Sequence, residues 1–246
     1  MHKIVLDKDF KELEDDIVNI KKIFDQSSTS IHKARNELKI IELQGIKCVV
    51  KSFKIPHIIN KIAYTFFRDS KALKSYNNAQ QLQQLQINTP QPIATIEFFE
   101  NSLLTHSYFI SHYEPYDFTI REVFHHKVED LKQILKEFAR FTHYIHQKGV
   151  WHVDYSLGNI LITKEPSSYR FSLVDINRMK FGRVSTQEGL KNFNKFWAKF
   201  DEDLPIIASE YAKIADFDEH KATKIVLQEA KKLERMVGIK RWLKGH

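Results

Sequence analysis

The sequence predicts an α+β fold in two parts, with an antiparallel sheet in the first part and a mainly helical second part. Short runs rich in β-branched residues alternate with turn residues up to about residue 112. From residue 128 onward, apolar residues recur at helical spacing. The polar, turn-prone stretch at 112–117 is a candidate hinge. We therefore expect one part at 1–113 and another at 114–246.

Length and composition are those of an ordinary globular protein. The 246 residues are 42% hydrophobic and 28% charged, which suffices for a substantial core and argues against disorder. Cys48 is the only cysteine, so no intrachain disulfide can form. Charges interrupt the N-terminal apolar stretch too early for a signal peptide, and no apolar run approaches the length of a membrane span. We therefore expect a cytoplasmic protein.

The first part contains two predicted strand pairs and a helix. Residues 38–43 and 46–53 are rich in β-branched side chains and flank Gln44-Gly45, as in a hairpin. Residues 70–86 lack Pro and Gly and carry apolar residues at helical spacing, so they predict a helix that the prolines of 89–92 end. Residues 93–99 and 107–111 predict the second strand pair.

Lys51 follows two valines on the second strand of the first hairpin. A lysine there can reach the α and β phosphates of a nucleotide. Taken alone, a lysine on an alternating strand is more simply a residue that faces solvent. The nucleotide interpretation therefore depends on the motif in the second part.

The second part begins with a long predicted helix. Apolar residues repeat at helical spacing from Val128 to Ile145, and Gly149 is a C-terminal stop. A polar loop at 152–159 follows. Residues 160–162 and 169–174 then predict a hairpin around the turn at 165–168. Two pairs of histidines lie near this helix, His125 with His126 and His143 with His146. Neither pair has a third ligand at metal-binding spacing, so we expect no metal site from them.

The polar loop has the spacing of a phosphoryl-transfer site. Moving the terminal phosphoryl of ATP needs a carboxylate to orient the acceptor hydroxyl, and oxygen ligands to hold magnesium. Asp154 can supply the first, and Asn159 with Asp175, sixteen residues later, can supply the second. The predicted hairpin brings Asn159, at the start of one strand, close to Asp175, at the end of the other. Each piece alone is a weak pattern, but together with His152 they indicate a kinase-type site.

These features together resemble the protein-kinase-like fold, with an antiparallel-sheet N-lobe and a mainly helical C-lobe. Within this fold, the chain most resembles the lipopolysaccharide kinase (Kdo/WaaP) family. The resemblance spans about 31–200, and it is carried by residues 48–51, 87–93, 116–119, 152–161 and 173–178.

The resemblance implies a phosphotransferase that uses ATP and Mg²⁺ to phosphorylate a sugar hydroxyl, of Kdo or heptose, in the inner core of lipopolysaccharide. It also implies a place at the cytoplasmic face of the inner membrane. Carried over residue by residue, it gives these roles: Asp154 as catalytic base, His152 as anchor of the catalytic loop, Lys51 as the phosphate-binding lysine, Asn159 and Asp175 as magnesium ligands, and Glu114 to Tyr116 as the hinge backbone at adenine.

Three positions depart from the usual kinase pattern. Asn77 aligns with the helix carboxylate that pairs with the strand lysine, and an amide can hydrogen-bond to Lys51 without neutralising it. The turn expected to cover the phosphates, at 27–36, has serines and an alanine in place of glycines. Asp175-Ile176-Asn177 stands where protein kinases have Asp-Phe-Gly, which argues against a protein kinase regulated through an activation loop.

Two other functions are compatible with the residues. The missing helix carboxylate and glycines suit a pseudokinase, which would bind nucleotide or serve as a scaffold. The presence of Asp154, Asn159 and Asp175 argues against this, because a decayed site usually loses one of them. A kinase acting on protein or another small molecule would keep the same site and change only the acceptor.

The C-terminal stretch at 221–246 is strongly basic. Eight Lys or Arg residues against Glu229 and Glu234 give it a net charge of +6, and apolar residues alternate with these charges as in an amphipathic helix. One interpretation is a last helix packed on the domain with a solvated basic face. The other is attraction to an anionic membrane surface or to an anionic acceptor such as lipid A-Kdo. No nucleic-acid motif is present, so we expect no such partner.

Overall fold

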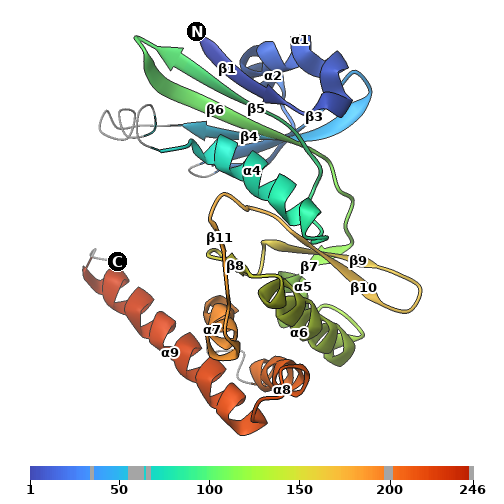
Figure 1. Cartoon of the computed structure of the whole chain (residues 1–246), viewed down its shortest axis with the longest axis vertical. Coiled ribbons are helices and arrows are strands. Elements are labelled where there is room, and N and C mark those ends of the chain that lie inside the picture. Colours follow the sequence, from blue (N-terminus) through green and yellow to red (C-terminus); the bar gives the residue numbers. More distant parts are fainter. Residues whose placement is uncertain (34–35, 55–63, 65–67, 197–201, 244–246) are drawn as a thin grey trace. The chain divides into compact units, whose positions relative to one another are not determined.

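The structure is a computed structural model that describes residues 1–33, 36–54, 64, 68–196 and 202–243. The chain forms two compact units, Met1–Glu114 and Pro115–His246. Figure 1 shows strands dominating the first unit and helices dominating the second. The predicted α+β class is confirmed. The boundary lies one residue from the predicted one.

The first unit is built on a six-stranded antiparallel sheet with the order β1-β5-β6-β4-β3-β2. Its strands are β1 (His2–Leu6), β2 (Ser30–Lys33), β3 (Asn36–Leu43), β4 (Ile46–Lys54), β5 (Pro92–Glu100) and β6 (Leu103–His112). Both predicted strand pairs are confirmed, as β3 with β4 and β5 with β6. Gln44 and Gly45 both adopt positive φ in the first turn, as a two-residue hairpin turn requires.

Helices pack on the sheet of the first unit. Three short helices, η1 (Lys8–Leu13), α1 (Glu14–Val18) and α2 (Ile20–Gln26), share a core cluster with one face of the strands, to which Val50 and Ile110 belong. The predicted helix is α4 (Lys71–Gln84), capped by Ser70, and it contacts β4, β5 and β6. Because side chains alternate along a strand, the neighbours of Val50 on β4 point to the other face.

The turn predicted to cover the phosphates lies partly outside the described residues. Residues 27–29 lead from α2 into β2, β2 pairs with β3, and residues 34 and 35 between these strands are not described. Counted from β2, the strand that carries Lys51 is the third, which is the position that the resemblance implies.

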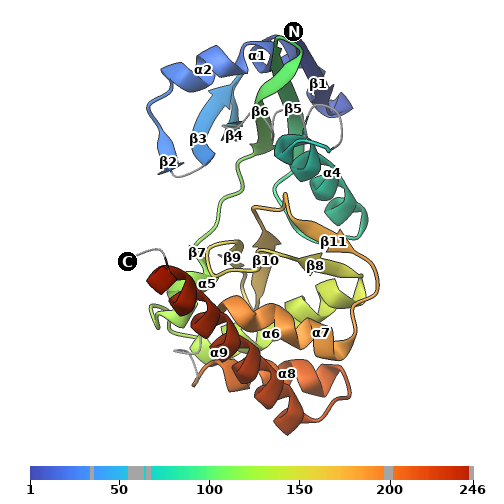
Figure 2. The same cartoon turned by 90° about the vertical axis from the view of Figure 1, so that its left-hand side faces the viewer.

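The second unit combines two small sheets with six helices among its described residues. Its elements are β7 (Phe118–Thr119), α5 (Ile120–Phe124), α6 (Leu131–Gln147), β8 (Val150–His152), β9 (Ile160–Lys164), β10 (Tyr169–Leu173), β11 (Met179–Phe181), α7 (Thr186–Lys191), η2 (Asn192–Phe196), α8 (Leu204–Ile214) and α9 (Glu219–Leu243). The sheets have the orders β10-β9-β7 and β11-β8. Figure 2 shows the strands of this unit together at one end of its helices.

Helix α6 forms the centre of the second unit. Its buried stripe includes Ile134, Phe138 and Ile145, and α6 packs against α8, which packs in turn against α9. The helix begins three residues later than Val128, the predicted start. Gly149 follows it with φ +73°, and a Cβ there would lie 2.7 Å from the carbonyl oxygen of Gly182. Only glycine combines that backbone conformation with such a close approach, so the predicted stop is confirmed.

Helix α9 is only partly packed. Ala222, Val226 and Ala230 are buried against its neighbours, but Met236, Ile239 and Trp242 in its last turns are exposed, Trp242 by 76%. Within the described residues, no helix is long and apolar enough to cross a membrane.

Candidate active site

The catalytic loop, residues 152–159, connects β8 to β9 and is anchored by a buried histidine. The backbone N–H of Asp154 donates to Nδ1 of His152 (3.1 Å), so the other ring nitrogen carries the proton. That nitrogen, Nε2, donates to the carbonyl oxygen of Val174 (3.1 Å), next to Asp175. Burial lowers the pKa of His152, which keeps the ring neutral in this tautomer. His152 thus ties the start of the loop to the end of β10.

Asp154 points its carboxylate at two cations. Nζ of Lys195 lies 2.5 Å from Oδ1, and Nη1 of Arg178 lies 3.1 Å from Oδ2. Burial by itself would raise the pKa of Asp154, but the hydrogen bond and charge of Lys195, with the charge of Arg178, hold that pKa below its usual range. Asp154 is therefore a carboxylate at any pH near neutrality.

The predicted hairpin brings Asn159 and Asp175 to the same place. Strands β9 and β10 pair so that Ile160 faces Leu173, and the N–H of Val174 donates to the carbonyl oxygen of Asn159 (3.0 Å). Asn159 therefore begins one strand where Asp175 follows the other. The prediction of the hairpin, and of the nearness of its two ends, is confirmed.

Hydrogen bonds to nearby residues orient the side chains of this pair. Nδ2 of Asn159 donates to the backbone oxygen of Asp154 (2.8 Å), which leaves the amide oxygen as the atom to face a cation. Asp175 has φ +56°, in the left-handed region that aspartate and asparagine adopt more readily than other residues with a side chain. Its Oδ1 accepts from Nδ2 of Asn177 (2.6 Å).

This donor set fits magnesium. Mg²⁺ prefers oxygen ligands and is usually held by one or two carboxylates, with water and substrate phosphates completing its shell. Asn159 supplies an amide oxygen and Asp175 a carboxylate. In the described part of the chain, no group of three or more His, Cys, Asp or Glu could hold a metal ion, but a magnesium site of this kind needs no such group.

Lys51 lies in the interior of the first unit, on β4. It is 8% exposed and faces Phe109 of β6, and its Nζ lies 5.3 Å from the ring centre of Phe53. By strand alternation, Lys51 and Phe53 share the face opposite to Val50. A buried lysine on that face differs from the solvent-facing lysine that the isolated strand would suggest.

Asn77, which the alignment pairs with Lys51, lies on α4. The buried side of α4 carries Ala72, Tyr76 and Ala79, whereas Asn77 lies on the exposed side. The pairing of Asn77 with Lys51 stays a prediction. Successive helix positions are about 100° apart, so an alignment error of one residue moves a side chain from one face to another.

The segment between the units carries the residues predicted to meet adenine. Glu114 ends the first unit, and Tyr116, at 44% exposed, lies in the second, in a stretch without regular structure. Their role at adenine stays a prediction.

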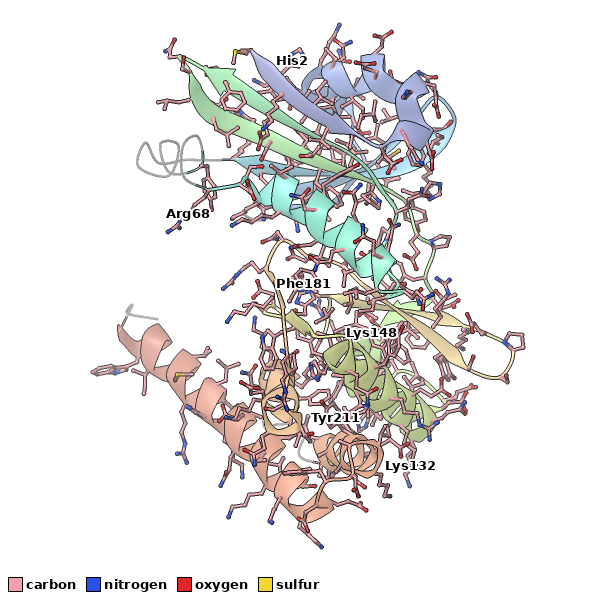
Figure 3. The ribbon with its side chains drawn as sticks, in the orientation of Figure 1. His2, Arg68, Lys132, Lys148, Phe181 and Tyr211 are labelled. Atoms are coloured by element: carbon pink, nitrogen blue, oxygen red, sulfur yellow. The ribbon has the colours of Figure 1, made fainter. Side chains whose placement is uncertain are left out.

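A buried hydrogen-bond relay, which the sequence did not predict, supports the catalytic loop. Tyr211 on α8, labelled in Figure 3, donates its hydroxyl proton to Nδ1 of His146 on α6 (2.9 Å). Nε2 of His146 donates to Oδ1 of Asn192 (3.1 Å), and Nδ2 of Asn192 donates to the backbone oxygen of His152 (3.0 Å). Burial lowers the pKa of His146 to about 4, so the ring stays neutral and can both donate and accept.

No sequence signal marked this relay or the two cations at Asp154. His146 has the helical spacing of a core residue, and neither Asn192 nor Lys195 belongs to a motif. Arg178 lies at the end of the stretch 173–178, where the resemblance implies no role for it. Each of these contacts joins residues far apart in the chain, which a local pattern does not record.

Gly189 on α7 is packed against the relay, and its replacement by alanine should disrupt it. An added Cβ would lie 2.7 Å from Nδ1 of His146 and closer still to the Tyr211 hydroxyl. Overpacking of this kind costs about 1–3 kcal/mol. We expect thermal unfolding of Gly189→Ala at a clearly lower temperature, with lower turnover because the loop loses its support.

Gly238→Ala is the matched control for this substitution. Gly238 lies in α9 with nothing within 4 Å of its added Cβ, so alanine should leave stability unchanged or raise it by up to about 1 kcal/mol. Equal unfolding temperatures for Gly189→Ala and the intact protein would contradict the packing described here.

Comparison with known proteins identifies the family. The sequence model of the lipopolysaccharide kinase (Kdo/WaaP) family matches residues 50–216, a range that contains Lys51, the whole catalytic loop and Asp175. The chain belongs to this family. Because the Kdo/WaaP proteins are kinases that act on lipopolysaccharide, the protein is a phosphotransferase, as predicted.

A solved structure of WaaP shows the same fold. A structure described as WaaP in complex with acyl carrier protein matches with a TM-score of 0.62 at 17% identity, covering 94% of this chain and 99% of that one. A structure of WbdD matches with a TM-score of 0.49 at 14% identity, covering 83% of this chain and 46% of that one. No curated protein sequence matches. The likeness to WaaP confirms the predicted protein-kinase-like fold.

Proposed function

We propose that this lipopolysaccharide kinase transfers the γ-phosphoryl of ATP to a sugar hydroxyl of the inner core, on Kdo or heptose, with magnesium. The observation that supports this most is the arrangement at the end of the β9–β10 hairpin. One hydrogen bond, from Val174 to Asn159, places an amide and the Asp175 carboxylate at the same end, and Asp154 belongs to the same loop. These are the groups that phosphoryl transfer needs.

Each residue then has a defined task. Asp154 accepts the hydrogen bond of the acceptor hydroxyl, aims its oxygen at the γ-phosphorus, and takes up the proton as the new bond to phosphorus forms. The bond from the γ-phosphorus to the β–γ bridging oxygen breaks in the same step, and ADP leaves. Asn159 and Asp175 would hold magnesium, which would neutralise charge on the phosphates. Lys51 contacts the α and β phosphates. His152 holds the loop that carries Asp154.

The electrostatics of Asp154 suit orientation more than strong basicity. Two cations hold the pKa of this carboxyl below its usual range, so its affinity for a proton is modest. In phosphoryl transfer the transition state is loose and positioning dominates, so a weak base that fixes the hydroxyl is sufficient.

Two acceptor molecules can show whether Kdo or heptose is phosphorylated. Labelled γ-phosphate from ATP is supplied with magnesium to lipid A-Kdo and, separately, to an acceptor extended with an unphosphorylated heptose. Label that enters lipid A-Kdo identifies Kdo as the target, and label that enters only the extended acceptor identifies heptose. Absence of label from both acceptors, with ATP bound, would contradict the proposed acceptor class and leave protein or another small molecule to be tested.

We also propose that the end of α9 attaches the kinase to the anionic cytoplasmic face of the inner membrane. The exposed Met236, Ile239 and Trp242 lie on the same helix end as the exposed Lys231, Lys232 and Arg235. An apolar stripe ending in Trp, flanked by basic residues, is typical of helices that lie in a membrane interface. This surface, residues 231–242, is called the α9 tip below.

Vesicle binding tests the α9 tip. We expect the kinase to sediment with vesicles that contain phosphatidylglycerol and far less with pure phosphatidylcholine. Each basic residue near an anionic surface contributes about 1 kcal/mol, so replacing Lys231, Lys232 and Arg235 with Gln should lower the partition coefficient by on the order of a hundredfold.

A charge-matched triple variant controls for net charge. Lys132, Lys136 and Lys148 are exposed on or beside α6, away from the α9 tip, and Figure 3 labels the first and last of them. Their replacement with Gln removes the same charge and should leave vesicle binding unchanged. An equal loss of binding in both triple variants would show that net charge alone, and not the α9 tip, causes attachment.

A further inference from the structure

Two cations from separate elements contact the one carboxylate of Asp154. Lys195 belongs to η2, and Arg178 follows Asp175 by three residues, just before β11. One cation would suffice to balance the carboxylate. With two positive charges against one negative, the three side chains carry a net charge of +1. The excess charge lies at the position that the acceptor hydroxyl must reach.

Both cations keep donors for a further ligand. A guanidinium has five N–H donors and an ammonium three, and each side chain directs one nitrogen at Asp154. Arg178 is 60% exposed and Lys195 is about one-third exposed. In the part of the chain that the structure describes, neither side chain makes another hydrogen bond.

The position of Arg178 is fixed by the backbone. The N–H of Val153 in the catalytic loop donates to the carbonyl oxygen of Arg178 (3.0 Å), alongside the β8–β11 pairing of His152 with Met179. The strand pair therefore fixes the backbone of Arg178 beside the catalytic loop, and the ion pair with Asp154 directs its guanidinium. A side chain that is fixed in advance loses less entropy when it binds a ligand.

We propose that Arg178 and Lys195 form an oxyanion-binding subsite for the acceptor. They bind a carboxylate or phosphate that the acceptor carries near the hydroxyl to be phosphorylated. The planar fork of arginine matches such an anion with two parallel hydrogen bonds, and Lys195 adds a point charge. This inference rests on the proposed function, because it names the charge of the acceptor at the same site.

Two pairs of probes separate the sources of the anion. The first pair is the methyl glycoside of Kdo and its methyl ester, which lacks the carboxylate charge. The second is lipid A-Kdo with and without its lipid A phosphates. Binding of each probe is measured by calorimetry on the intact protein with magnesium and a non-hydrolysable ATP analogue, and phosphorylation is measured separately with ATP.

We expect the intact protein to prefer the charged member of at least one pair by about tenfold or more, as a charge-assisted hydrogen bond provides. A preference for acid over ester identifies the sugar carboxylate as the anion, and a preference confined to the second pair identifies phosphate. In Arg178→Gln the preference should fall toward one, and in Arg178→Gln combined with Lys195→Gln it should disappear. Each preference is the ratio of the affinities of the two probes of a pair for the same variant. A loss of affinity that both probes share therefore cancels.

Arg140→Gln is the matched control. Arg140 is 59% exposed and pairs with Glu210 at 2.7 Å, much as Arg178 pairs with Asp154, but it lies on α6 outside the loop. The Arg140→Gln variant should keep the intact protein's preference for the charged probe. All variants should unfold at similar temperatures.

Two outcomes would overturn the subsite. In one, the intact protein binds both members of each pair equally. In the other, the preference survives in the double variant while affinity for the ATP analogue falls, which would assign the two cations to the nucleotide. The proposed function is judged separately, by phosphorylation. If neither these probes nor the heptose-extended acceptor is phosphorylated but the Arg178-dependent preference in binding is present, the proposed function fails and the subsite stands.

Discussion

Asp154→Asn should slow phosphoryl transfer by about 10²–10⁴-fold, the usual contribution of a positioned acid or base. The amide keeps the shape of the side chain but no longer accepts the proton of the acceptor hydroxyl. ATP binding should be nearly unchanged, because Lys51, Asn159 and Asp175 contact the nucleotide and its metal in the proposed arrangement. Single-turnover rates and nucleotide affinity, measured on the same samples, separate the two effects.

Glu165→Gln is a suitable control for Asp154→Asn. Glu165 is an exposed carboxylate on the turn of the β9–β10 hairpin, which follows the catalytic loop, and it pairs with Arg170 at 3.4 Å. It should leave the transfer rate unchanged. A transfer rate in Asp154→Asn within about twofold of the intact protein would remove Asp154 from the reaction, since catalytic acids and bases contribute far more.

Asp175→Asn should act through the metal. The substitution removes the carboxylate from the proposed magnesium pair, so the magnesium concentration for half-maximal activity should rise by at least about 10–100-fold, the loss that outer-shell partners alone cause. Turnover at saturating magnesium should recover in part. This response differs from that of Asp154→Asn, which no magnesium concentration should rescue.

Asn177→Ser should change the magnesium requirement in the same way as Asp175→Asn, but less. Nδ2 of Asn177 donates to Oδ1 of Asp175 at 2.6 Å and so helps to aim the carboxylate. Its loss should shift the magnesium requirement in the same direction by a smaller factor. An unchanged requirement in Asp175→Asn would show that this carboxylate is not a metal ligand.

The parts of the fold that the sequence predicted are those with local signals. The turn at Gln44-Gly45, the absence of helix breakers in 70–86 and the Gly149 stop each act within a few residues, and the structure has the expected elements there. The same holds for the β9–β10 hairpin. Its pairing of Ile160 with Leu173 is what brings Asn159 and Asp175 together, so the nearness of the two followed from local sequence.

The features that the sequence did not predict depend on distant contacts. Strand β1 pairs with β5 so that His2 faces Phe98, and nothing near the N-terminus indicates that partner. The relay joins Tyr211 to the catalytic loop through two other elements. Lys195 reaches Asp154 only because η2 packs beside the loop.

The predicted pairing of Asn77 with Lys51 rests on an alignment and not on a local signal. Along a helix without glycine or proline, periodicity sets the buried face but not its alignment with another protein, and α4 has such a sequence. The burial of Ala72, Tyr76 and Ala79 shows which face of α4 points inward, and an alignment alone does not show this.

The most direct test of the account is a single turnover from a preformed complex of the protein with ATP and magnesium, mixed with lipid A-Kdo that is extended with an unphosphorylated heptose. We predict that ATP is consumed in step with the formation of a phosphate monoester on the glycolipid, and that both are lost in Asp154→Asn. Consumption of ATP to free phosphate with unmodified glycolipid, or bound ATP that is never consumed, would contradict the account.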